Sequence, residues 1–373
     1  MPDFTSTLPL AAIWAGSVSL LVALLLVATR QWHGVLTLDS SNGVQKFHTA
    51  PTPRVGGVAI MAGVLVGYQF ADDSRQSLLW PLILAGIPAF AFGLLEDLTK
   101  RVSVRARLLA TMACGVLGWA MTGASITHVD VPVLDWLLSF TVISVVFTAF
   151  AVGGVANAIN IIDGFNGLAA GTVIVILTAF GVIATSLGDA DLARASLIFA
   201  GAVVGFLLVN WPSGKLFLGD GGAYFGGFAL AWLSVLLAAR NPEMSPWAPL
   251  LVCGYPILEV IFSIVRRHRR HLSPGAPDRL HLHSLVKRRL VRKLLPQASN
   301  LVRNSVTGAI MMVAAWLPAV IAVNWFSNTA TLILGLVVCA VLYSAVYARL
   351  TQFRWCWRAT TSRRPAMVKP AAG

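Results

Sequence analysis

Charged residues are scarce in this chain of 373 residues: they make up 12% of it, whereas 57% is hydrophobic. That excludes an ordinary soluble globule, in which about a quarter of the residues are charged. Acidic residues are fewer than basic residues, with 15 Asp and Glu against 28 Lys and Arg, and the formal net charge is +13. Each of the few carboxylates is therefore a candidate for a specific role.

Cysteine is also rare, and its spacing shows no pairing. The four cysteines, Cys114, Cys253, Cys339 and Cys356, lie in apolar runs or near the C-terminus. This pattern argues against a disulfide framework and against a cysteine zinc site. The sequence shows no nucleic-acid-binding module and no internal repeat, so we expect no nucleic acid partner.

Long apolar runs are abundant. A membrane-spanning helix needs roughly 20 apolar residues, and in lipid only helices and closed barrels satisfy their own backbone polar groups. The sequence therefore predicts an all-α polytopic integral membrane protein with about 11 transmembrane helices. We expect these spans near residues 8–29, 55–70, 80–95, 105–123, 136–157, 168–187, 193–211, 222–239, 247–265, 304–323 and 329–349.

The distribution of basic residues orients these spans. With the N-terminus outside, all 28 Lys and Arg residues except Arg75, Arg194 and Arg240 fall in inner loops or in the C-terminal tail. The positive-inside rule thus predicts an outside N-terminus and a cytoplasmic C-terminus. The positive charge would then face anionic membrane lipids and anionic substrates rather than DNA.

Polar residues concentrate in five predicted inner connections of one transmembrane domain, residues 1–349. These connections are 30–54, 96–104, 158–167, 212–221 and 266–303. Residues 350–373 are predicted to form a basic, disordered cytoplasmic tail that lies against anionic lipid.

The first two connections combine cations with special backbone or carboxylate residues. Lys46, His48 and Arg54 precede or enter a proline- and glycine-rich stretch and could hold phosphate; a positive-inside anchor before a stiffened helix entry is the alternative. Glu96 and Asp97 end an apolar run and could hold Mg²⁺ or take a proton from an attacking group. Solvated charges that cap the helix are the alternative for this pair.

The next two connections each bring one more carboxylate. Asn157, Asn160 and Asp163 recur at three-residue intervals and would line one face of a helix. Such polar groups near the end of a span are costly unless they face protein or a wet cavity, although Asp163 could also cap a helix. Asp220 lies between glycines, where it suits either a metal–diphosphate complex or the N-cap of the following helix.

In the last connection, His281 and His283 would share a face of an extended segment. A zinc site would need further ligands that are not nearby, so phosphate binding or proton handling fits better. Glu259, just before this connection, is either a buried partner for one of its arginines or part of the site, and the sequence leaves both open.

The order and spacing of these motifs resemble one known superfamily. They are PTPRVGG at 51–57, the acidic pair at 96–97, NAINIIDGFNGLAAG at 157–171, FLGDGG at 217–222 and RLHLH at 279–283. Over roughly residues 46–290 the chain resembles the polyprenyl-phosphate N-acetylhexosamine-1-phosphate transferases of glycosyltransferase family 4. This superfamily includes the phospho-N-acetylmuramoyl-pentapeptide translocases.

The resemblance implies transfer of a sugar 1-phosphate from a UDP-N-acetylhexosamine to undecaprenyl phosphate in a bacterial inner membrane, with release of UMP. Mg²⁺ is the implied cofactor, with Mn²⁺ as a substitute, and a homodimer is left open. The implied catalytic residues are Asp97, Asp163 and Glu96, and the implied metal ligands are Asp220 and Asp97. The implied substrate-binding residues are Lys46, His48, Thr52, Arg54, Asn157, Asn160, Asn166, Asn210, Lys215, Arg279, His281 and His283.

Two positions depart from the superfamily pattern. Glu96 stands where an aspartate is frequent and keeps a carboxylate, whereas Asn166 stands where a second acidic residue is frequent and does not. A role that needs negative charge at Asn166 is therefore not carried over, although its amide oxygen could still bind metal or sugar.

The HLH motif and the span count look more like the branch that starts O-antigen and related surface polysaccharides. One alternative is the phospho-N-acetylmuramoyl-pentapeptide transferase of peptidoglycan synthesis. Another is a non-enzymatic lipid-linked sugar transporter, which would be expected to place ionisable residues near the bilayer midplane.

Overall fold

The structure, a computed structural model, describes residues 10–39, 52–71, 73–271 and 280–352. Its first half contains α1 (Leu10–Ala28), α2 (Arg30–Thr37), β1 (Leu38–Asp39), β2 (Thr52–Pro53), α3 (Gly56–Gln69), α4 (Asp73–Thr99), α5 (Val104–Thr122), α6 (Pro132–Leu138), α7 (Thr141–Ile162) and α8 (Leu168–Ser186). Its second half contains α9 (Ala190–Asn210), α10 (Gly219–Arg240), α11 (Trp247–Val252), α12 (Gly254–Arg269), α13 (Leu282–Val286), a π-helical turn (Lys287–Val291), α14 (Arg292–Leu294), α15 (Asn300–Trp325) and α16 (Thr329–Thr351).

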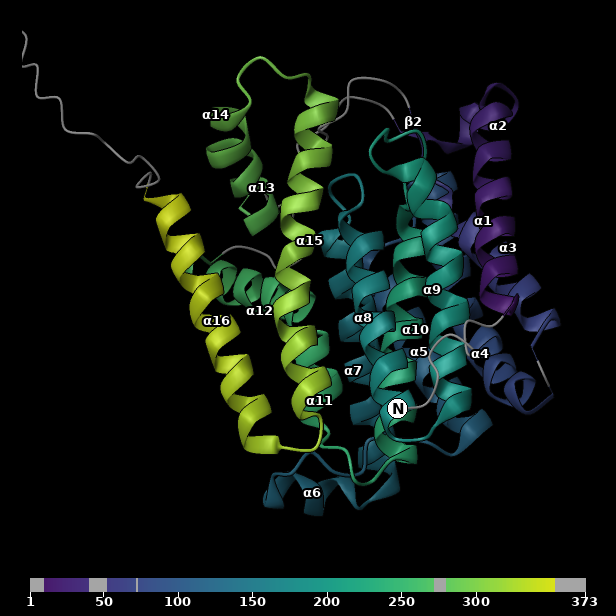
Figure 1. Cartoon of the computed structure of the whole chain (residues 1–373), viewed down its shortest axis with the longest axis vertical. Coiled ribbons are helices and arrows are strands. Elements are labelled where there is room, and N and C mark those ends of the chain that lie inside the picture. The colour runs from purple at the N-terminus through teal and green to yellow at the C-terminus, as the bar shows by residue number, and fades with distance from the viewer. Residues whose placement is uncertain (1–9, 40–51, 72, 272–279, 353–373) are drawn as a thin grey trace, which may run out of the picture.

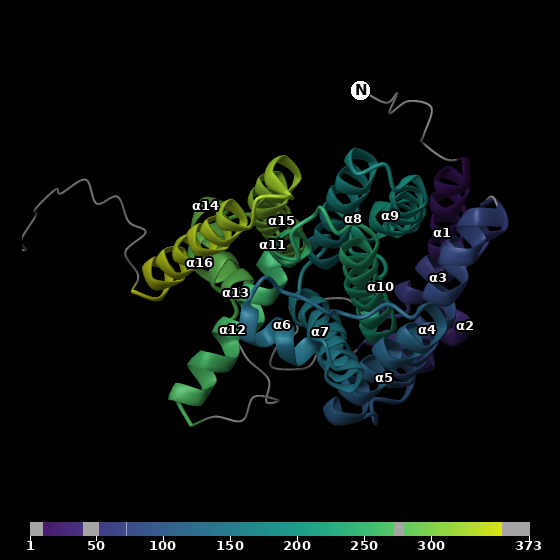
Figure 2. The same cartoon turned by 90° about the horizontal axis from the view of Figure 1, so that it is seen from below.

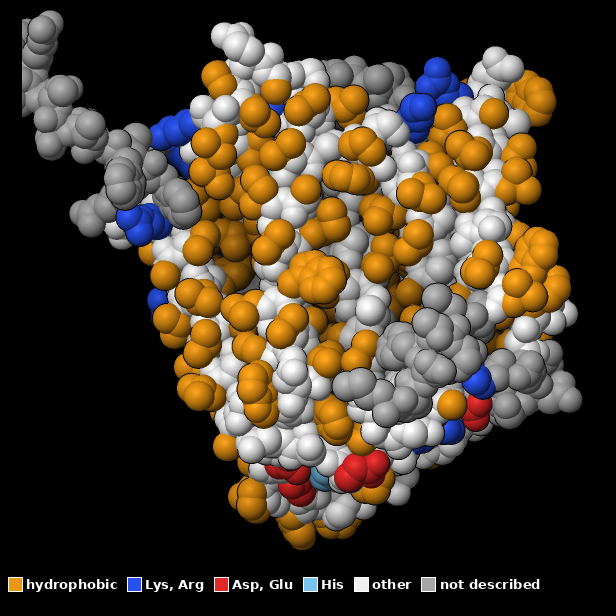
Figure 3. Space-filling view, viewed as in Figure 1, with side chains coloured by type: hydrophobic (Ala, Val, Ile, Leu, Met, Phe, Trp, Pro, Cys, Tyr) orange, Lys and Arg blue, Asp and Glu red, His pale blue; other side chains and the backbone are white. Residues whose placement is uncertain are grey.

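Most of the long helices run side by side as a bundle, while α6 lies at its lower end and α12 runs crosswise to the long helices and projects from the bundle (Figures 1 and 2). Within the described ranges, nine helices are long and apolar enough to cross a membrane. Hydrophobic side chains cover the middle of the face seen in Figure 3, with Lys and Arg toward its upper edge and Asp and Glu toward its lower end. The expected polytopic, all-helical membrane protein is therefore confirmed, apart from the two-residue strand pair β1–β2.

The predicted count of about 11 spans is not confirmed, because two expected spans differ from the helices found. The span near 55–70 is α3, a shorter apolar helix of 14 residues. The span expected at 247–265 is wrong as a single helix, since the chain breaks at Cys253 between α11 and α12. Pro256 has no N–H with which to bond the carbonyl of Val252, so a continuous helix would lose that bond.

Two expected boundaries also moved. The span expected at 136–157 divides into the short helix α6 and the long helix α7. Because α7 continues to Ile162, residues 158–162 belong to a helix rather than to the connection predicted at 158–167. The basic tail lies outside the described residues from position 353 onward, and the orientation of the bundle in a membrane stays a prediction.

Helix α10 forms the centre of the bundle and is buried along almost its whole length (Figure 2). It packs against α3, α4, α7 and α8. Small residues permit these close contacts, which is how helices associate where lipid removes the usual hydrophobic driving force. At Gly227 a Cβ atom would lie 2.6 Å from the Cα atom of Ala156 in α7, whereas at Gly226 nothing lies within 4 Å of the added atom.

These two adjacent glycines give a matched stability test. We expect Gly227→Ala to lower the free energy of unfolding by about 1–3 kcal/mol, because the α7 backbone would have to move. Gly226→Ala should leave stability unchanged or raise it by up to about 1 kcal/mol, through the helix preference of alanine. Thermal unfolding of both variants in the same detergent is the measurement, and equal midpoints would contradict the close α7–α10 packing.

Candidate active site

Backbone hydrogen bonds fix the chain after β2 against the start of α10. The N–H of Phe217 donates to the carbonyl of Pro53 at 2.9 Å, and the N–H of Gly56 donates to the carbonyl of Phe217 at 2.9 Å. These bonds join two segments more than 160 residues apart in sequence. They bring Arg54 to the N-terminal end of α10.

Asp97, in the last turn of α4, binds the N-terminus of α10. Its side chain is buried, and Oδ1 accepts the N–H of Asp220 while Oδ2 accepts the N–H of Gly221, both at 2.9 Å. A carboxylate is favourable here because the first N–H groups of a helix have no partner within the helix and its dipole is positive at that end. The preceding Gly219 has φ +74°, and a Cβ there would lie 2.2 Å from the carbonyl oxygen of Arg54, so only glycine fits.

Asp220, in the first turn of α10, is surrounded by cationic and amide donors. Its Oδ1 accepts Nη2 of Arg54 and Nδ2 of Asn160, each at 3.1 Å, and its Oδ2 accepts Nη1 of Arg107. Tyr224, one turn further along α10, donates its hydroxyl to Oδ1 of Asn160 at 3.3 Å. The carboxylate that the sequence suggested as a helix cap is instead compensated by two guanidinium groups, as burial of its charge requires.

Asp163 caps the C-terminal end of α7 and is half-buried. Burial raises its pKa to about 6, although the Arg54 charge and the N–H of Gly219 both act to lower it. Below that pH the carboxyl is mostly neutral, and above it the carboxylate dominates. We call Asp97, Asp163 and Asp220 the acidic centre; all three lie around Arg54 at one end of the bundle, and their place at a membrane face stays a prediction.

Glu96, the other member of the predicted acidic pair, holds a loop. Its Oε2 accepts the N–H of Val102 at 2.8 Å, which closes the connection between α4 and α5. Asp97 is therefore the member of the pair that contacts α10, and a catalytic role for Glu96 stays a prediction.

Two predicted substrate-binding asparagines connect loops. Oδ1 of Asn210 accepts the N–H of Gly167 at 2.6 Å, and its Nδ2 donates to the carbonyl of Leu216 at 2.8 Å. Nδ2 of Asn166 donates to Oγ of Ser305 at 3.1 Å, which joins the turn before α8 to α15. Both asparagines are buried, so these amides set the shape of the loops beside the acidic centre.

The remaining predicted residues are distributed around this end of the bundle. Asn157 is half-buried on α7, three residues before Asn160, while Thr52 is buried in β2 and Lys215 is exposed in the loop before α10. Lys46, His48 and Arg279 lie outside the described residues.

His281 and His283 lie next to the acidic centre. Their rings stack with centroids 5.2 Å apart, and the His283 ring meets the edge of Phe165 at 5.5 Å. A Cβ placed on Gly164 would lie 3.3 Å from Nε2 of His283, so this histidine sits directly beside the residue that follows Asp163. Nζ of Lys287 lies 5.4 Å from the Phe165 ring centre. We call Phe165, His281, His283 and Lys287 the histidine wall.

Lys287 is buried, and this lowers the pKa of its ammonium group to about 8, with the charges of Arg303 and Arg292 acting in the same direction. The motifs of the sequence assign no site role to Lys287, Arg107 or Tyr224. The available signal was that Arg107 enters an apolar helix and that Tyr224 follows the FLGDGG motif by two residues.

The acidic centre offers the oxygen ligands that Mg²⁺ prefers. Among the described side chains, no group of three or more His, Cys, Asp or Glu forms a complete metal cage. Mg²⁺ typically binds through one or two carboxylates together with substrate phosphates and water, so a site completed by a diphosphate fits this donor set. Each oxygen of Asp97 accepts one N–H and keeps a second lone pair, and Asp220 lies next to it.

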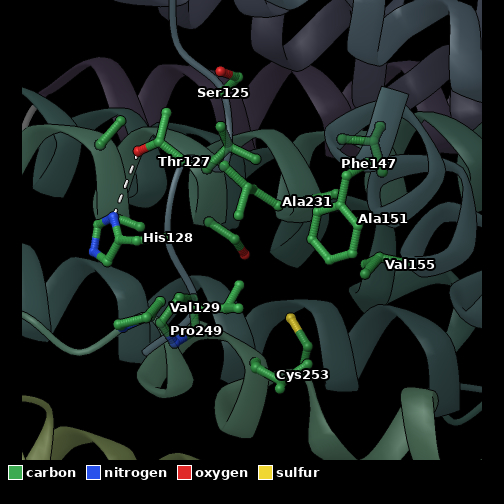
Figure 4. Close-up of a pocket in the computed structure, with 18 of the residues that line it drawn as sticks. Ser125, Thr127, His128, Val129, Phe147, Ala151, Val155, Ala231, Pro249 and Cys253 are labelled. Carbon is green, nitrogen blue, oxygen red and sulfur yellow. Dashed lines mark hydrogen bonds between the residues drawn. The ribbon is translucent and has the colours of Figure 1, made fainter. Parts of the chain in front are cut away.

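An apolar cavity of about 200 Å³ lies between α7, α10 and α11. One face of α7 lines it through Phe147, Ala151 and Val155, and Cys253 lies on the opposite side (Figure 4). Val155 precedes Asp163 by eight residues, which is about 12 Å of helix rise. On α10 the lining residues begin at Ala231, 11 residues after Asp220, and end at Ala239, so the cavity lies deeper in the bundle than the acidic centre, toward the end that carries Arg240.

Comparison with known proteins identifies similar sequences. Residues 79–238 match the model of Glycosyl transferase family 4. The chain is 29% identical over 240 residues to a probable undecaprenyl-phosphate N-acetylglucosaminyl 1-phosphate transferase of Bacillus subtilis (strain 168), covering 64% of this chain and 66% of that relative, just under two thirds of its length.

Two enterobacterial relatives carry the name undecaprenyl-phosphate alpha-N-acetylglucosaminyl 1-phosphate transferase. The Yersinia pestis protein is 28% identical over 272 residues, covering 72% of this chain and 74% of the relative. The protein of Escherichia coli (strain K12) is 26% identical over 277 residues, covering 73% and 75%. The segment matched by the family model contains the whole acidic centre together with Arg107 and Asn160. Over this segment the chain is thus similar to Glycosyl transferase family 4.

Proposed function

We propose that this protein transfers N-acetylglucosamine 1-phosphate from its UDP derivative to undecaprenyl phosphate and releases UMP. The observation that carries this proposal is the acidic centre, three carboxylates and two arginines collected at one end of an apolar bundle. A lipid phosphate resides at that depth of a membrane, and the names of the relatives supply the lipid and the sugar. The product would initiate a lipid-linked surface polysaccharide such as O-antigen, on the cytoplasmic side of the inner membrane.

In this reaction an oxygen of the lipid phosphate attacks the phosphorus atom that carries the sugar. A new P–O bond forms, the bond to the bridging oxygen breaks, and UMP leaves with that electron pair. Phosphoryl transfer asks a protein mainly for positioning and charge stabilisation. When the lipid phosphate enters as a monoanion, its proton passes to Asp163, which is ionised at neutral pH because its pKa is about 6.

The cationic groups would hold the two phosphates of the donor. Arg54 and Arg107 reach the centre from two different elements, and Lys287 lies over the ring of Phe165, two residues after Asp163. Asp97 and Asp220 would hold Mg²⁺, which when bound would neutralise charge on the diphosphate. Asp97 also keeps α10 in place through its two N–H contacts, so it positions Asp220 as well.

The apolar cavity between α7, α10 and α11 would take part of the isoprenoid chain of the lipid. Its lining is almost wholly apolar and includes Phe147, Ala151 and Val155 of α7, the helix that carries Asn160 and is capped by Asp163. A chain seated there would leave its phosphate at the acidic centre.

Replacement of Asp97 tests the reaction and the site together. Asp97→Asn removes a charge and turns an NH₂ group toward one of two backbone N–H donors, so we expect UMP release to fall on the order of 100-fold or more. The measurement is UMP formed by purified protein in detergent with undecaprenyl phosphate, UDP-N-acetylglucosamine and Mg²⁺.

Asp189→Asn is the matched control. Asp189 lies at the other end of the bundle, where its carboxylate pairs with Arg240 at 2.6 Å, and this variant should keep wild-type activity. Folded wild-type protein that releases no UMP with any UDP-N-acetylhexosamine would contradict the proposal and favour a transporter, which consumes no donor.

Lys287 should make donor binding depend on pH. Since its pKa is about 8, its charge is present below that pH and lost as the pH rises through it. We expect KM for UDP-N-acetylglucosamine to rise by up to about tenfold between pH 7 and 9, the fall in the protonated fraction. In Lys287→Arg the guanidinium stays protonated over this range, so its KM should change far less; an equal rise in both proteins would assign the pH dependence to another group.

A further inference from the structure

Glu259 is an acidic residue of α12 whose side chain is completely buried. A buried carboxylate is costly unless it is paired and hydrogen-bonded. Here Oε1 accepts two donors from the segment that follows the gap in the described chain: Nδ1 of His281 at 3.0 Å and the N–H of Leu282 at 3.0 Å. Glu259 therefore binds both the ring and the adjacent backbone of one histidine.

A second residue of α12 supports the same segment. Nη1 of Arg266 donates to the carbonyl of Leu280 at 3.0 Å and to the hydroxyl of Tyr347 in α16 at 3.2 Å. The backbone is thus held immediately before and immediately after His281. Such double support leaves the ring little freedom, which is what a preorganised binding group needs.

The hydrogen bond to Glu259 also determines which ring nitrogen of His281 carries a proton and which one is left to meet a ligand. The two nitrogens of a histidine are distinct, and the hydrogen bond made by one selects the role of the other. With Nδ1 donating to Glu259, Nε2 is the nitrogen through which His281 would meet a substrate. The His281 ring stacks on His283, which contacts Phe165 and lies beside Gly164, so the histidine pair lies against the two residues that follow Asp163.

We propose that Glu259 is a positioning residue for sugar-phosphate transfer: it holds His281 in the orientation and protonation pattern in which Nε2 faces the diphosphate of the donor. This inference rests on the proposed function. It makes Glu259 a partner of the histidine wall and not of the arginines in the connection that follows it, which was the alternative that the sequence left open.

The activity test measures UMP release by full-length protein in detergent, with undecaprenyl phosphate, UDP-N-acetylglucosamine and Mg²⁺. Glu259→Leu removes the accepting oxygen, and we expect kcat/KM to fall roughly 10- to 100-fold, the usual cost of losing the partner of a functional histidine. Glu259→Gln keeps an accepting oxygen at the same reach and should lose less. Tyr255→Phe is the control: it changes another buried polar side chain one turn earlier on α12, and it should keep the wild-type kcat/KM.

A double-mutant cycle separates positioning from general support of the fold. If Glu259 acts through His281, the double variant Glu259→Leu/His281→Ala will be no slower than His281→Ala alone. Losses that multiply would show that Glu259 acts independently of His281 and would overturn the inference. Wild-type activity in Glu259→Leu would overturn it as well.

A spectroscopic measurement keeps the inference testable if Glu259→Leu does not fold. In wild-type protein labelled with ¹⁵N-histidine, the His281 signals are assigned by their loss in His281→Ala. A proton on Nδ1, alone or together with one on Nε2, is expected, and a neutral ring protonated only on Nε2 would contradict the contact with Glu259. This readout needs no turnover, so failure of the proposed reaction and failure of the Glu259 contact are distinguished.

Discussion

The structure of the site depends on one carboxylate, that of Asp97, which accepts two backbone N–H groups at the N-terminus of α10. This contact joins the end of α4 to the start of the central helix and satisfies donors that the helix cannot satisfy itself. It sets where α10 begins, and therefore where Asp220 points, toward Arg54, Arg107 and Asn160. Gly219 is the accompanying constraint, since any side chain there would strike the backbone of Arg54.

Asp97, which the sequence predicts to take part in catalysis, thus also stabilises the packing of α4 against α10. Charge at the acidic centre is balanced by contacts between helices distant in sequence, so the centre and the packing of α4, α7 and α10 form together. This balance explains why three carboxylates can be tolerated at one end of an apolar bundle, because buried charges persist only where partners offset them. Activity and stability should consequently be hard to separate at Asp97, whereas Lys287 and Glu259 act from a different set of elements.

Much of this arrangement could be predicted from the sequence, because it depends on where apolar runs begin and end and where acidic residues interrupt them. Apolar runs of spanning length gave most of the helices, and the interruptions that carry Asp97, Asp163 and Asp220 indicated that these residues meet at one end. Pairings such as Arg54 with Asp220 could not be predicted, since they depend on three-dimensional packing across 166 positions. Hydropathy also measures the length of an apolar run but does not show where a helix within it breaks. The run over 247–265 was therefore predicted as one helix, although Pro256 lies within it and the chain breaks at Cys253.

The break at Cys253 matters for the proposed reaction, because α12 turns crosswise to the long helices and projects from the bundle instead of continuing α11 (Figures 1 and 2). Ile257, near the start of α12, lines the apolar cavity, and Glu259, two residues later, holds His281. A straight helix would carry both residues along the bundle axis and away from the connection that follows. The bent arrangement lets one short helix contact the proposed lipid chain with one side chain and support the proposed phosphate ligand with another. The proposed site for the lipid chain and the support of His281 therefore share one helix, α12, so both substrates of the proposed reaction would be positioned relative to the same element.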